Sequence, residues 1–520
     1  MVPHNTFADG RIDRRRFLTA VGASTTVFGV GISGAVSSDG ITETELTIES
    51  FDGTELGATL YEPNAGGQHP AVLMTHGYGG NRSLSQFLSD RGTTYANNGY
   101  VVLTYDSRGF GDSGGEVGLN GPNEVRDAQH LITHLAALDS VQTDGPDNPR
   151  VGMDGTSYGG GIQLNTAIAE ANGTGLPESN DRIDAIVPRW AWHDLTYSLA
   201  PNGVIKRGWA LLLTVAGAAG AHLTGTDAFD FLQGQAPELY ELLYHGLVEN
   251  ELPDWGIRYL TDRSPVGKID SITSPALFIH GFSDTLFTPL EALWNARAST
   301  AHRLVLTNGG HSLSGIAAGL SDEGSAIDAL AHTWLDTHLR GDETTDLPAV
   351  TYYDSESGGY KTADGIPASG TTWEEWSVAG VTDDETSYAP NTGPIESPIS
   401  TLSFEWAIDR ELTLFGPPEL SLTVDPFGPE CRLFASLAHV RDGATTQIDD
   451  QVTPLRIEGD GPLERTVSLP PLSRSFTPGD ALRLTVSTAN VGYQPSRSAV
   501  GVWLHHGTAE ETRLRLPIRD

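Results

Sequence analysis

The sequence has almost no cysteine and very little lysine. The shortage of cysteine excludes disulfide frameworks and metal sites built from several thiolates. Of its 520 residues one is a cysteine, Cys431, so the chain builds no internal disulfide framework and no metal site from several thiolates. Lysine occurs only at Lys206, Lys268 and Lys361, which leaves 28 arginines among the 31 basic residues. With 38% hydrophobic residues the chain can still bury more than one core.

Positive charge is also scarce as a whole. The chain has 67 acidic against 31 basic residues, a formal net charge of -36 and a pI near 4.6. Such a charge repels polyanions, so nucleic acid and an anionic membrane surface are not expected partners. Many carboxylates with almost no lysine are typical of a surface kept hydrated in concentrated salt, where repulsion is screened. The alternative is an ordinary acidic protein that works at low salt.

Residues 1–38 are predicted to be a twin-arginine export signal. Three arginines at 14–16 are followed by Phe17, Leu18 and an uncharged, mildly apolar run over residues 19–36. A basic region before a weakly hydrophobic one is typical of this route, which exports folded proteins and predicts an extracellular or cell-surface location. An uncleaved membrane anchor stays open, because the run is about long enough to span a bilayer. A basic tail before a buried helix is the other alternative.

Residues 40–345 read as an α/β domain. Short apolar runs alternate with stretches of helical periodicity, of which residues 124–138 are the clearest. Buried runs that alternate with helices predict a mostly parallel sheet covered on both faces. The runs expected as strands are 71–74, 100–105, 150–153, 185–188, 276–279 and 303–306.

Two further regions depart from this alternation. Residues 190–270 are rich in aromatic and apolar helix-like segments, and an insertion of this length between two strands predicts a helical cap above the sheet. From residue 346 to 520, Gly and Pro punctuate short alternating runs such as 419–424 and 482–486. That pattern predicts an all-β domain, a sandwich or jelly roll.

The chemistry centres on the segment Gly155-Thr156-Ser157-Tyr158-Gly159. A predicted strand precedes it and a predicted helix follows, which is the context of a nucleophile elbow, and both positions two residues from the serine are glycine. Ser157 is therefore the expected nucleophile. Ser113 has the same Gly-x-Ser-x-Gly spacing and resembles the serine motif of trypsin-like proteases, but the residues after it cannot begin a helix.

A neutral serine needs a general base, and the base needs an orienting carboxylate. In a doubly wound hydrolase these follow in the order Ser, acid, His, on loops after later strands. Asp284 follows the apolar run 276–279 and His311 follows the run 303–306, so they are the expected acid and base. The alternative acid is Asp270. The stronger alternative bases are His193 and His280, and the weaker ones are His245, His332, His338, His505 and His506.

The reaction also needs hydrogen-bond donors for a developing oxyanion. The backbone N–H of Tyr158, directly after the nucleophile, is one. The second is expected from the His76-Gly77-Tyr78-Gly79-Gly80 loop, with Tyr78 donating through its backbone or its hydroxyl. Asp106 and Arg108 are expected to order a loop as a pair.

Together these features resemble the Xaa-Pro dipeptidyl-peptidase and cocaine-esterase family of serine hydrolases. The resemblance rests on the elbow, on the segment Asp-Ser-Arg-Gly-Phe-Gly-Asp-Ser-Gly-Gly at 106–115, on Glu124 with Asp127, and on the β-domain. It implies an α/β-hydrolase fold with a helical cap and a galactose-binding-like jelly roll beside the site. It also implies a triad of Ser157, Asp284 and His311, and an oxyanion role for Tyr78.

The expected function is that of an exported, salt-adapted serine hydrolase that cleaves an amide or ester through an acyl-serine intermediate, in the manner of an Xaa-Pro dipeptidyl-peptidase. A carboxylesterase or acylase is the alternative within the family, since the histidine loop reads Asn-Gly-Gly-His instead of Gly-Pro-Trp-x-His. A non-catalytic secreted protein that binds glycan or polymer is the alternative outside it. The expected partner is a small-molecule or peptide substrate, with no metal or organic cofactor, and the oligomeric state stays open.

The substrate depends on the cap. A dipeptidyl-peptidase needs a carboxylate for a free N-terminal ammonium, and an esterase or acylase needs an apolar acyl pocket. Trp190 and Trp192 are expected to face the cleft, although such aromatic residues also pack a cap onto its sheet. The cap carboxylates that could bind an ammonium are Asp194, Asp227, Asp230, Glu238 and Glu241.

Overall fold

The central sheet of the computed structural model has eleven strands in the order β1-β2-β3-β5-β4-β8-β9-β10-β11-β12-β13. Neighbouring strands from β5 to β12 are parallel, and the strands outside this block pair antiparallel. The strands are β1 (Val36–Ser38), β2 (Ile41–Glu49), β3 (Glu55–Pro63), β4 (Ala71–Thr75), β5 (Val101–Tyr105), β8 (Val151–Thr156), β9 (Ala185–Arg189), β10 (Ala276–Gly281), β11 (His302–Thr307), β12 (Val350–Asp354) and β13 (Gly359–Ala363). A separate short hairpin joins β6 (Thr143–Gly145) and β7 (Asn148–Pro149).

The structure describes residues 36–38, 40–83, 85–220, 235–311, 322–341, 346–377, 386–388, 401–459, 461–497, 501–505 and 512–519. Residues 35–520 form one compact unit. Nearly all of the predicted export signal lies outside the described residues. Its last three residues form β1, which pairs with β2 in the central sheet.

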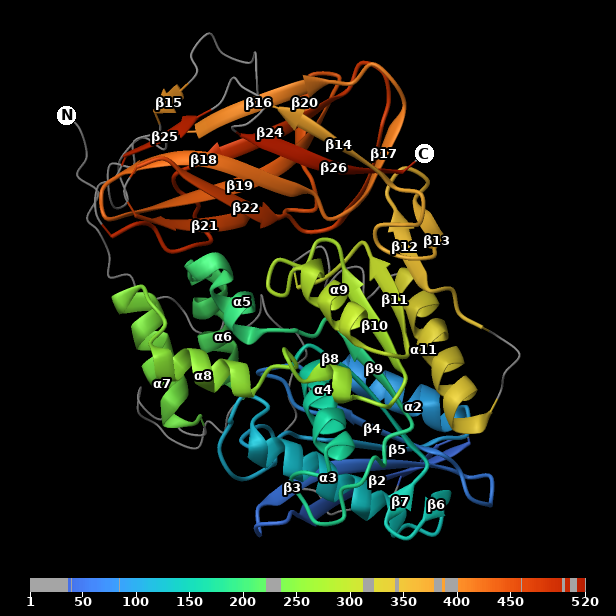
Figure 1. The fold of residues 1–520 in the computed structure, drawn as a ribbon. Helices are drawn as coiled ribbons and strands as arrows, with labels where there is room; N and C mark the ends of the chain where they lie inside the picture. The colour runs from blue at the N-terminus through green and yellow to red at the C-terminus, as the bar shows by residue number, and fades with distance from the viewer. Residues whose placement is uncertain are drawn as a thin grey trace, which may run out of the picture. The chain divides into compact units, whose positions relative to one another are not determined.

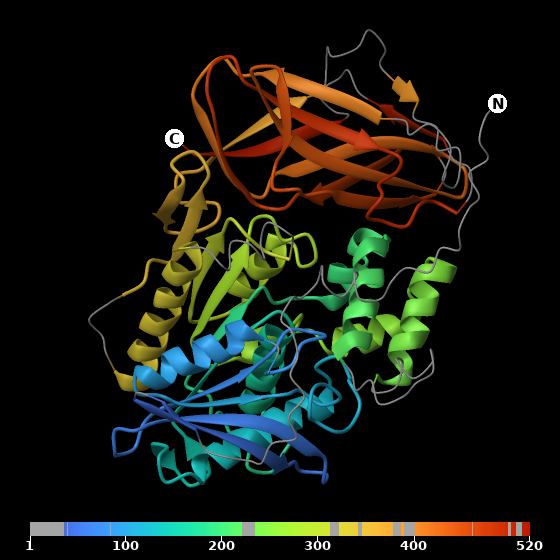
Figure 2. The same cartoon turned by 180° about the vertical axis from the view of Figure 1, so that it is seen from behind.

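Both faces of the parallel strands are covered by helices, which is why β4, β5, β9 and β10 are buried at every position. Alternate residues of β4 point to opposite sides, with Val72 and Met74 in one apolar cluster and Ala71 and Leu73 in another. The first cluster includes residues of α2 (Gln86–Asn97) and α11 (Asp322–Arg340), and the second includes residues of α3 (Pro122–Ala136), α4 (Tyr158–Ala171) and α9 (Pro289–Ala298). Figures 1 and 2 show these layers from opposite sides.

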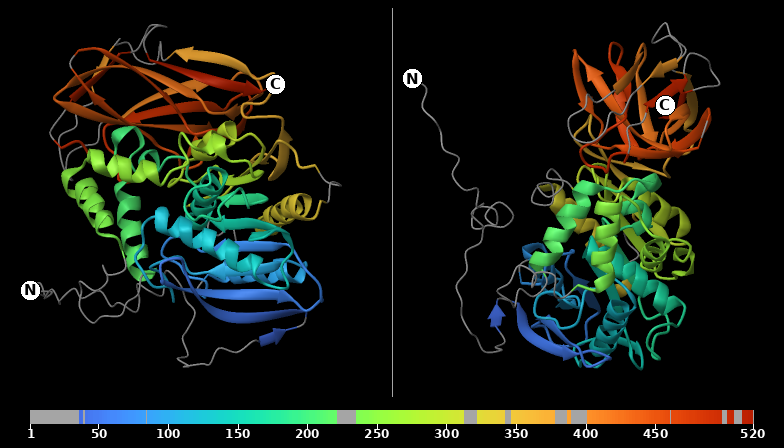
Figure 3. Two further views of the ribbon diagram at one scale, coloured as in Figure 1. Left: turned by 60° about the horizontal axis from the view of Figure 1, so that its bottom comes forward. Right: turned by 90° about the vertical axis from the view of Figure 1, so that its left-hand side faces the viewer.

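The predicted insertion between β9 and β10 is helical. Its α-helices are α5 (Leu195–Leu199), α6 (Arg207–Gly220), α7 (Pro237–Tyr244) and α8 (Asp254–Asp262), shown in green in Figure 3. Other helical turns lie at Pro201–Gly203, His245–Glu249 and Ile269–Ser271. We call residues 190–270 the cap.

The C-terminal part is all-β, as predicted. One antiparallel sheet contains β15-β25-β18-β26-β17-β23 with β14 and β22 beside it, and the other contains β16-β24-β19-β20 with β21. Their inner faces share one apolar core, to which β18 contributes Leu420, Leu422 and Val424. The strands are β14 (Thr372–Ser377), β15 (Thr386–Tyr388), β16 (Thr401–Ala407), β17 (Leu412–Gly416), β18 (Glu419–Phe427), β19 (Glu430–Arg441), β20 (Ala444–Gln447), β21 (Thr453–Glu458), β22 (Leu463–Ser468), β23 (Leu472–Phe476), β24 (Ala481–Ser487), β25 (Gly501–His505) and β26 (Arg513–Arg519).

The central sheet continues past residue 345, where the sequence places the end of the α/β domain. β12 pairs with β11 in parallel and β13 closes the edge as a hairpin. Burial alternates along β12, because this strand lies next to the edge of the sheet. Its pattern therefore resembles that of the all-β domain, although the strand pairs within the central sheet.

Candidate active site

Ser157 stands on a strained turn between β8 and α4. Its backbone has φ 60° and ψ -115°, a conformation that residues other than glycine rarely adopt. A Cβ at Gly155 would collide with the backbone of Gly159, and a Cβ at Gly159 would collide with the carbonyl of Thr75. Both glycines are thus required by close backbone contacts. The Ser157 amide donates to the carbonyl oxygen of Arg189 at 2.8 Å, which ties the turn to the end of the neighbouring strand.

Asp284 and His311 follow β10 and β11, neighbouring parallel strands whose carboxyl ends meet at one edge. His311 Nδ1 lies 2.6 Å from Asp284 Oδ2. The other carboxylate oxygen, Oδ1, accepts from the amides of Leu286 at 3.0 Å and Phe287 at 2.8 Å. Burial acts to raise the pKa of Asp284, but the charge and hydrogen bond of His311 outweigh it and hold this pKa below its usual range. The acid is therefore ionised and fixed in orientation.

Aromatic rings surround the other side of His311. Ring centroids lie 5.0 Å away for Phe287, 5.7 Å for Trp190 and 6.1 Å for Trp209. The Nε2 atom of His311 is buried and has no hydrogen-bond partner within the described part of the chain. The ring is thus oriented through Nδ1, and Nε2 is left to exchange a proton with another group.

Ser113 and Asp270, the alternative nucleophile and acid, lie in surroundings that do not suit a catalytic role. Ser113 is fully buried, and its hydroxyl donates to the Asp106 carbonyl at 2.6 Å and accepts from the Gly57 amide at 3.0 Å. Asp270 lies in an exposed helical turn of the cap. Each therefore has a location that suits a structural or solvated residue.

The alternative histidines His280 and His193 have hydrogen-bond partners outside the triad. His280 is fully buried, and burial lowers its pKa; its Nε2 lies 2.6 Å from the Phe287 carbonyl and 3.8 Å from Asp284 Oδ2. His193 Nδ1 lies 2.9 Å from Asn295 Oδ1. Of the remaining candidates, His245 lies in the cap, His332 and His338 lie on α11, His505 lies on β25, and His506 is outside the described residues.

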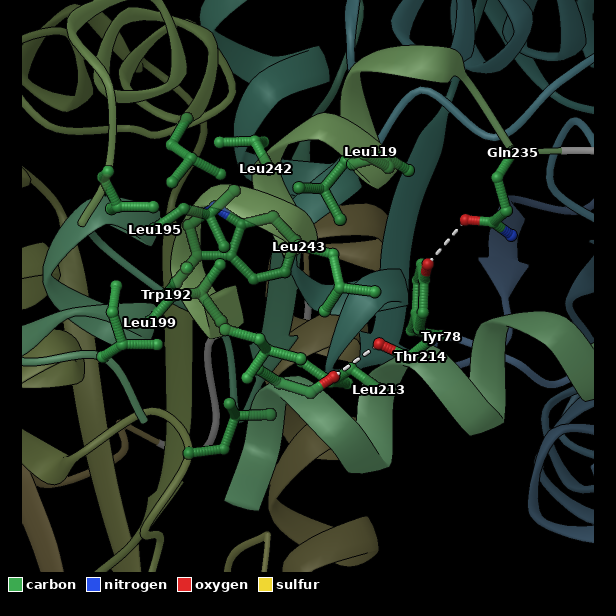
Figure 4. A pocket seen from close by; sticks show the side chains of 18 of the residues that line it. Tyr78, Leu119, Trp192, Leu195, Leu199, Leu213, Thr214, Gln235, Leu242 and Leu243 are labelled. Carbon is green, nitrogen blue, oxygen red and sulfur yellow. Dashed lines mark hydrogen bonds between the residues drawn. The ribbon is translucent and has the colours of Figure 1, made fainter. Parts of the chain in front are cut away.

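The loop after β4 borders the nucleophile, as expected for an oxyanion loop. A Cβ at Gly77 would lie 3.8 Å from the Cβ of Ser157. The Tyr78 hydroxyl donates to Gln235 Oε1 at 2.7 Å (Figure 4), and its ring centroid lies 5.5 Å from that of Tyr158. Burial raises the pKa of Tyr78, so its hydroxyl keeps its proton and can act as a donor. Tyr158 begins α4 directly after the serine.

Asp106 and Arg108 do not pair with each other, contrary to expectation. Asp106 binds the guanidinium and the amide of Arg82. Arg108 binds Asp127 through two hydrogen bonds of 2.7 and 2.8 Å and Asp52 at 2.8 Å. The two residues order loops through separate partners, which their closeness in sequence concealed.

A cavity of about 160 Å³ opens at the nucleophile. Ser157, Tyr78 and Tyr158 form part of its wall, and most of the rest is apolar and comes from the cap. Trp192 lines it, with its indole nitrogen donating to the Arg263 carbonyl at 3.0 Å, whereas Trp190 contacts His311 instead. The leucines that line the cavity are Leu119, Leu195, Leu199, Leu213, Leu239, Leu242, Leu243, Leu247, Leu252, Leu260 and Leu286 (Figure 4 labels several of them).

None of the described residues that line this cavity carries a charge. Its polar groups from the cap are Gln235, Thr214 and Tyr240, and the Thr214 hydroxyl donates to a carbonyl of its own helix. Of the cap carboxylates, Asp194 accepts from the Thr196 amide and caps α5. The others are exposed or lie outside the described residues: Glu238 and Glu241 are exposed, and Asp227 and Asp230 are not described.

Two residues contact the acid loop that the sequence did not single out. Lys206, from the cap, donates to two carbonyls directly after Asp284. Gln451, from the all-β domain, donates to the Asp284 carbonyl at 2.9 Å. Both lie far from Asp284 in sequence and belong to no motif, so only the rarity of lysine could have drawn attention to one of them.

The described part of the chain contains neither a cluster of metal ligands nor a helix suited to span a membrane. Among the described residues, no three His, Cys, Asp or Glu side chains gather as they would around a metal ion. No helix there combines the length and apolar character needed to cross a bilayer.

Two family models match the sequence. The model of the X-Pro dipeptidyl-peptidase (S15 family) matches residues 52–313, and that of the X-Pro dipeptidyl-peptidase C-terminal non-catalytic domain matches residues 342–502. Among curated proteins, cocaine esterase of Rhodococcus sp. (strain MB1 Bresler) is 28% identical over 193 residues, which are 35% of this chain and 30% of the esterase. The chain spans less than half the length of the curated relatives it matches.

Solved structures extend the likeness to nearly the whole chain. A CocE/NonD family hydrolase from Staphylococcus aureus has a TM-score of 0.71 at 15% identity, covering 96% of this chain and 99% of that one. An α-amino acid ester hydrolase has a TM-score of 0.71 at 16% identity, covering 96% of this chain and 100% of that one. At these identities the likeness establishes the fold alone.

Proposed function

Since the chain belongs to the X-Pro dipeptidyl-peptidase (S15) family, we propose that it is a serine hydrolase that takes an apolar acyl group onto Ser157 from an ester or amide. The family and the hydrolase class agree with the resemblance drawn from the motifs. The choice of an esterase or acylase over a dipeptidyl-peptidase is the proposal, and the uncharged cavity at Ser157 carries it.

In the proposed mechanism His311 Nε2 takes the proton of the Ser157 hydroxyl as the oxygen attacks the substrate carbonyl. Asp284 keeps the ring in the tautomer with its proton on Nδ1 and stabilises the imidazolium that forms. The Tyr158 amide and the Tyr78 hydroxyl stabilise the oxyanion, the latter after leaving Gln235. His311 then protonates the leaving group. A water activated by His311 attacks the acyl-serine in the same way, which releases the carboxylic acid product and restores Ser157.

The acyl side of the substrate is inferred from the cavity. A free N-terminal ammonium placed among leucines would be desolvated without a partner, which disfavours a dipeptide. An alkyl or aryl acyl group would instead exchange water for apolar contacts. The absence of a charged group among the described lining residues therefore supports an uncharged acyl group.

A fluorophosphonate probe and a matched substrate panel test this proposal. We expect covalent labelling of Ser157 and hydrolysis of p-nitrophenyl butyrate and hexanoate. For alanyl-prolyl p-nitroanilide, acetylation of the amine should leave kcat/KM unchanged or raise it. A loss of more than about tenfold on acetylation would mean that an ammonium is recognised, since a lost charge-assisted contact has at least that effect. A loss on acetylation would favour a dipeptidyl-peptidase. Complete absence of fluorophosphonate labelling would favour a non-catalytic binding protein.

We also propose that the protein is exported by the twin-arginine route. The arginines at 14–16 and the uncharged run after them support this. Replacing Arg14 and Arg15 by lysine should leave folded, active enzyme inside the cell, because the route discriminates the arginine pair itself. Unchanged secretion of the double variant would refute it.

Adaptation to high salt is proposed from the charge of -36. Screening shortens to about 3 Å at 1 M salt, which removes most long-range repulsion between carboxylates. The melting temperature should therefore rise steeply from low salt to molar KCl. A flat profile would indicate an ordinary acidic protein.

A further inference from the structure

The most unusual buried group outside the triad is an ammonium. Lys206 is one of three lysines in the chain and is 1% exposed. Its Nζ donates to the carbonyl oxygens of Thr285 at 2.9 Å and Leu286 at 2.7 Å. A lysine is almost never fully buried without a specific partner, and here the bonded partners are two backbone carbonyls.

These carbonyls belong to the peptide groups that hold the acid. The peptide group 285–286 carries the Thr285 carbonyl and the Leu286 amide, and the group 286–287 carries the Leu286 carbonyl and the Phe287 amide. Both amides donate to Asp284 Oδ1, at 3.0 and 2.8 Å. In a trans peptide the C=O and N–H point in opposite directions. Each group therefore accepts from Lys206 at one end and donates to Asp284 at the other.

We propose that Lys206 is a positioning residue for the reaction, which acts on Asp284 through the 285–286 and 286–287 peptide groups. Its ammonium fixes both peptide planes and polarises them, so that the amides bind Oδ1 firmly and Oδ2 is directed to His311. This inference rests on the proposed function, because it assigns Lys206 a role only if Asp284 and His311 act on Ser157.

The charges around Lys206 determine how its removal should affect pH dependence. Glu291 on α9 and Asp284 favour the ammonium, whereas burial lowers its pKa, to about 8. Glu291 is bonded to other donors, the Ser198 hydroxyl and the amides of His193 and Asp194. The other titratable or charged groups nearby are His280 and His311 beside Asp284, Asp450 and Tyr493 across a cavity that Lys206 lines, and Arg207 next in sequence.

Two effects of losing Lys206 move the acid limb of the kcat/KM profile in the same direction. The ammonium of Lys206 attracts the Asp284 carboxylate, so its loss leaves this carboxylate freer to stabilise the imidazolium of His311. Weaker amide bonds to Asp284 make its carboxylate a stronger acceptor for that imidazolium, which acts in the same direction. His311 must be neutral to act as base, so the acid limb of the kcat/KM profile should move to higher pH.

Three variants measured from pH 5 to 9 on p-nitrophenyl butyrate test the proposal. Lys206→Met removes charge and donors, and we expect kcat to fall about 10-fold to 100-fold, as for other residues that orient a catalytic group. Its acid limb should move up by about one pH unit. Lys206→Arg keeps charge and donors and should restore the position of the limb. Lys268→Met is the matched control, because Lys268 also donates to two carbonyls, at 3.1 and 3.4 Å, but in the cap at the end of α8.

The outcomes separate this inference from the proposed function. If wild-type Ser157 labels and turns over substrate but Lys206→Met keeps the wild-type acid limb, Lys206 only stabilises the fold and the proposal is wrong. If wild type neither labels nor turns over, the proposed function fails first. Should Lys206→Met not fold, Lys206→Gln removes the charge and keeps an amide NH₂ group that can donate. An unshifted limb in folded Lys206→Gln refutes the electrostatic part, and a shifted one supports it.

Discussion

Two glycines of the turn that carries Ser157, which we call the sheet wall, have less room than Gly246, a cap residue that lines the cavity in what we call the cap wall. On the sheet side, Gly155 and Gly159 have no room for a Cβ, because backbone atoms occupy the place. On the cap side, a Cβ at Gly246 would lie 3.7 Å from the Ile205 side chain, an ordinary contact. In the proposed reaction the sheet wall supplies the nucleophile, and the cap wall supplies apolar surface for the acyl group. The proposed chemistry thus depends on backbone positions, whereas the proposed acyl pocket depends on side chains.

The largest effect should come from the sheet wall. Ser157→Ala should lower turnover by about 10⁶-fold with the fold intact, because the triad members act as a unit. Ser113→Ala is the matched control, since Ser113 shares the Gly-x-Ser-x-Gly spacing but is buried and bonds to the Asp106 carbonyl and the Gly57 amide. The Ser113→Ala variant should lose about 1–3 kcal/mol of unfolding free energy and keep the wild-type activity per folded molecule. Steady-state kinetics with thermal melts measures both, and a Ser157→Ala enzyme that retains activity contradicts the assignment.

The acid should matter less than the nucleophile. Asp284→Asn should lower kcat by about 10⁴-fold, because the amide favours the wrong tautomer of His311. Asp270→Asn, at the exposed turn once considered for the same role, should leave kcat unchanged. Equal losses in the two variants would show that the acid has been misassigned.

The strand ends and the nucleophile turn can be predicted from the sequence, whereas the lining of the cap wall cannot, for one physical reason. Ser157, Asp284 and His311 each follow a strand with a readable apolar run, and the elbow glycines are dictated by local backbone contacts. The cap pocket depends on which side of each helix meets the sheet, and this is set by tertiary packing. Trp190 and Trp192 are two residues apart, yet one contacts His311 and the other lines the cavity.

Residues that act across long sequence separations were missed for the same reason. Lys206 from the cap and Gln451 from the all-β domain contact the loop that holds Asp284. No local sequence pattern predicts these contacts. The partners of Asp106 and Arg108 were misjudged because neighbouring opposite charges suggest a pair, while Arg82 and Asp127 lie elsewhere in sequence. Strand and motif positions can be predicted locally. Side-chain partners can be predicted where a motif pairs them, as for Asp284 and His311, but not where only tertiary packing brings them together.

The same substitution placed in both walls compares them directly. Gly159→Ala forces a Cβ against the Thr75 carbonyl, so the elbow must shift. A displacement near 1 Å at the nucleophile costs about 10²-fold in kcat. Gly246→Ala adds a methyl group with ordinary contacts and should change kcat less than about twofold, as a tolerated volume change. Kinetics on both variants, with melting temperatures as control, checks this, and equal losses would remove the distinction between the walls.

The smallest expected effect tests whether the cap wall selects the acyl group. Leu213 lies on α6 and lines the cavity, so Leu213→Phe should shorten the longest acyl chain that fits. The value of kcat/KM for p-nitrophenyl hexanoate should fall about tenfold, since one methylene in an apolar pocket is worth roughly 10-fold to 200-fold, while the acetate ester should be unaffected. Leu211→Phe is the control on the same helix, because Leu211 is 52% exposed and does not line the cavity. A parallel loss on acetate and hexanoate would mean that Leu213 supports the site as a whole, and then the acyl group must bind elsewhere.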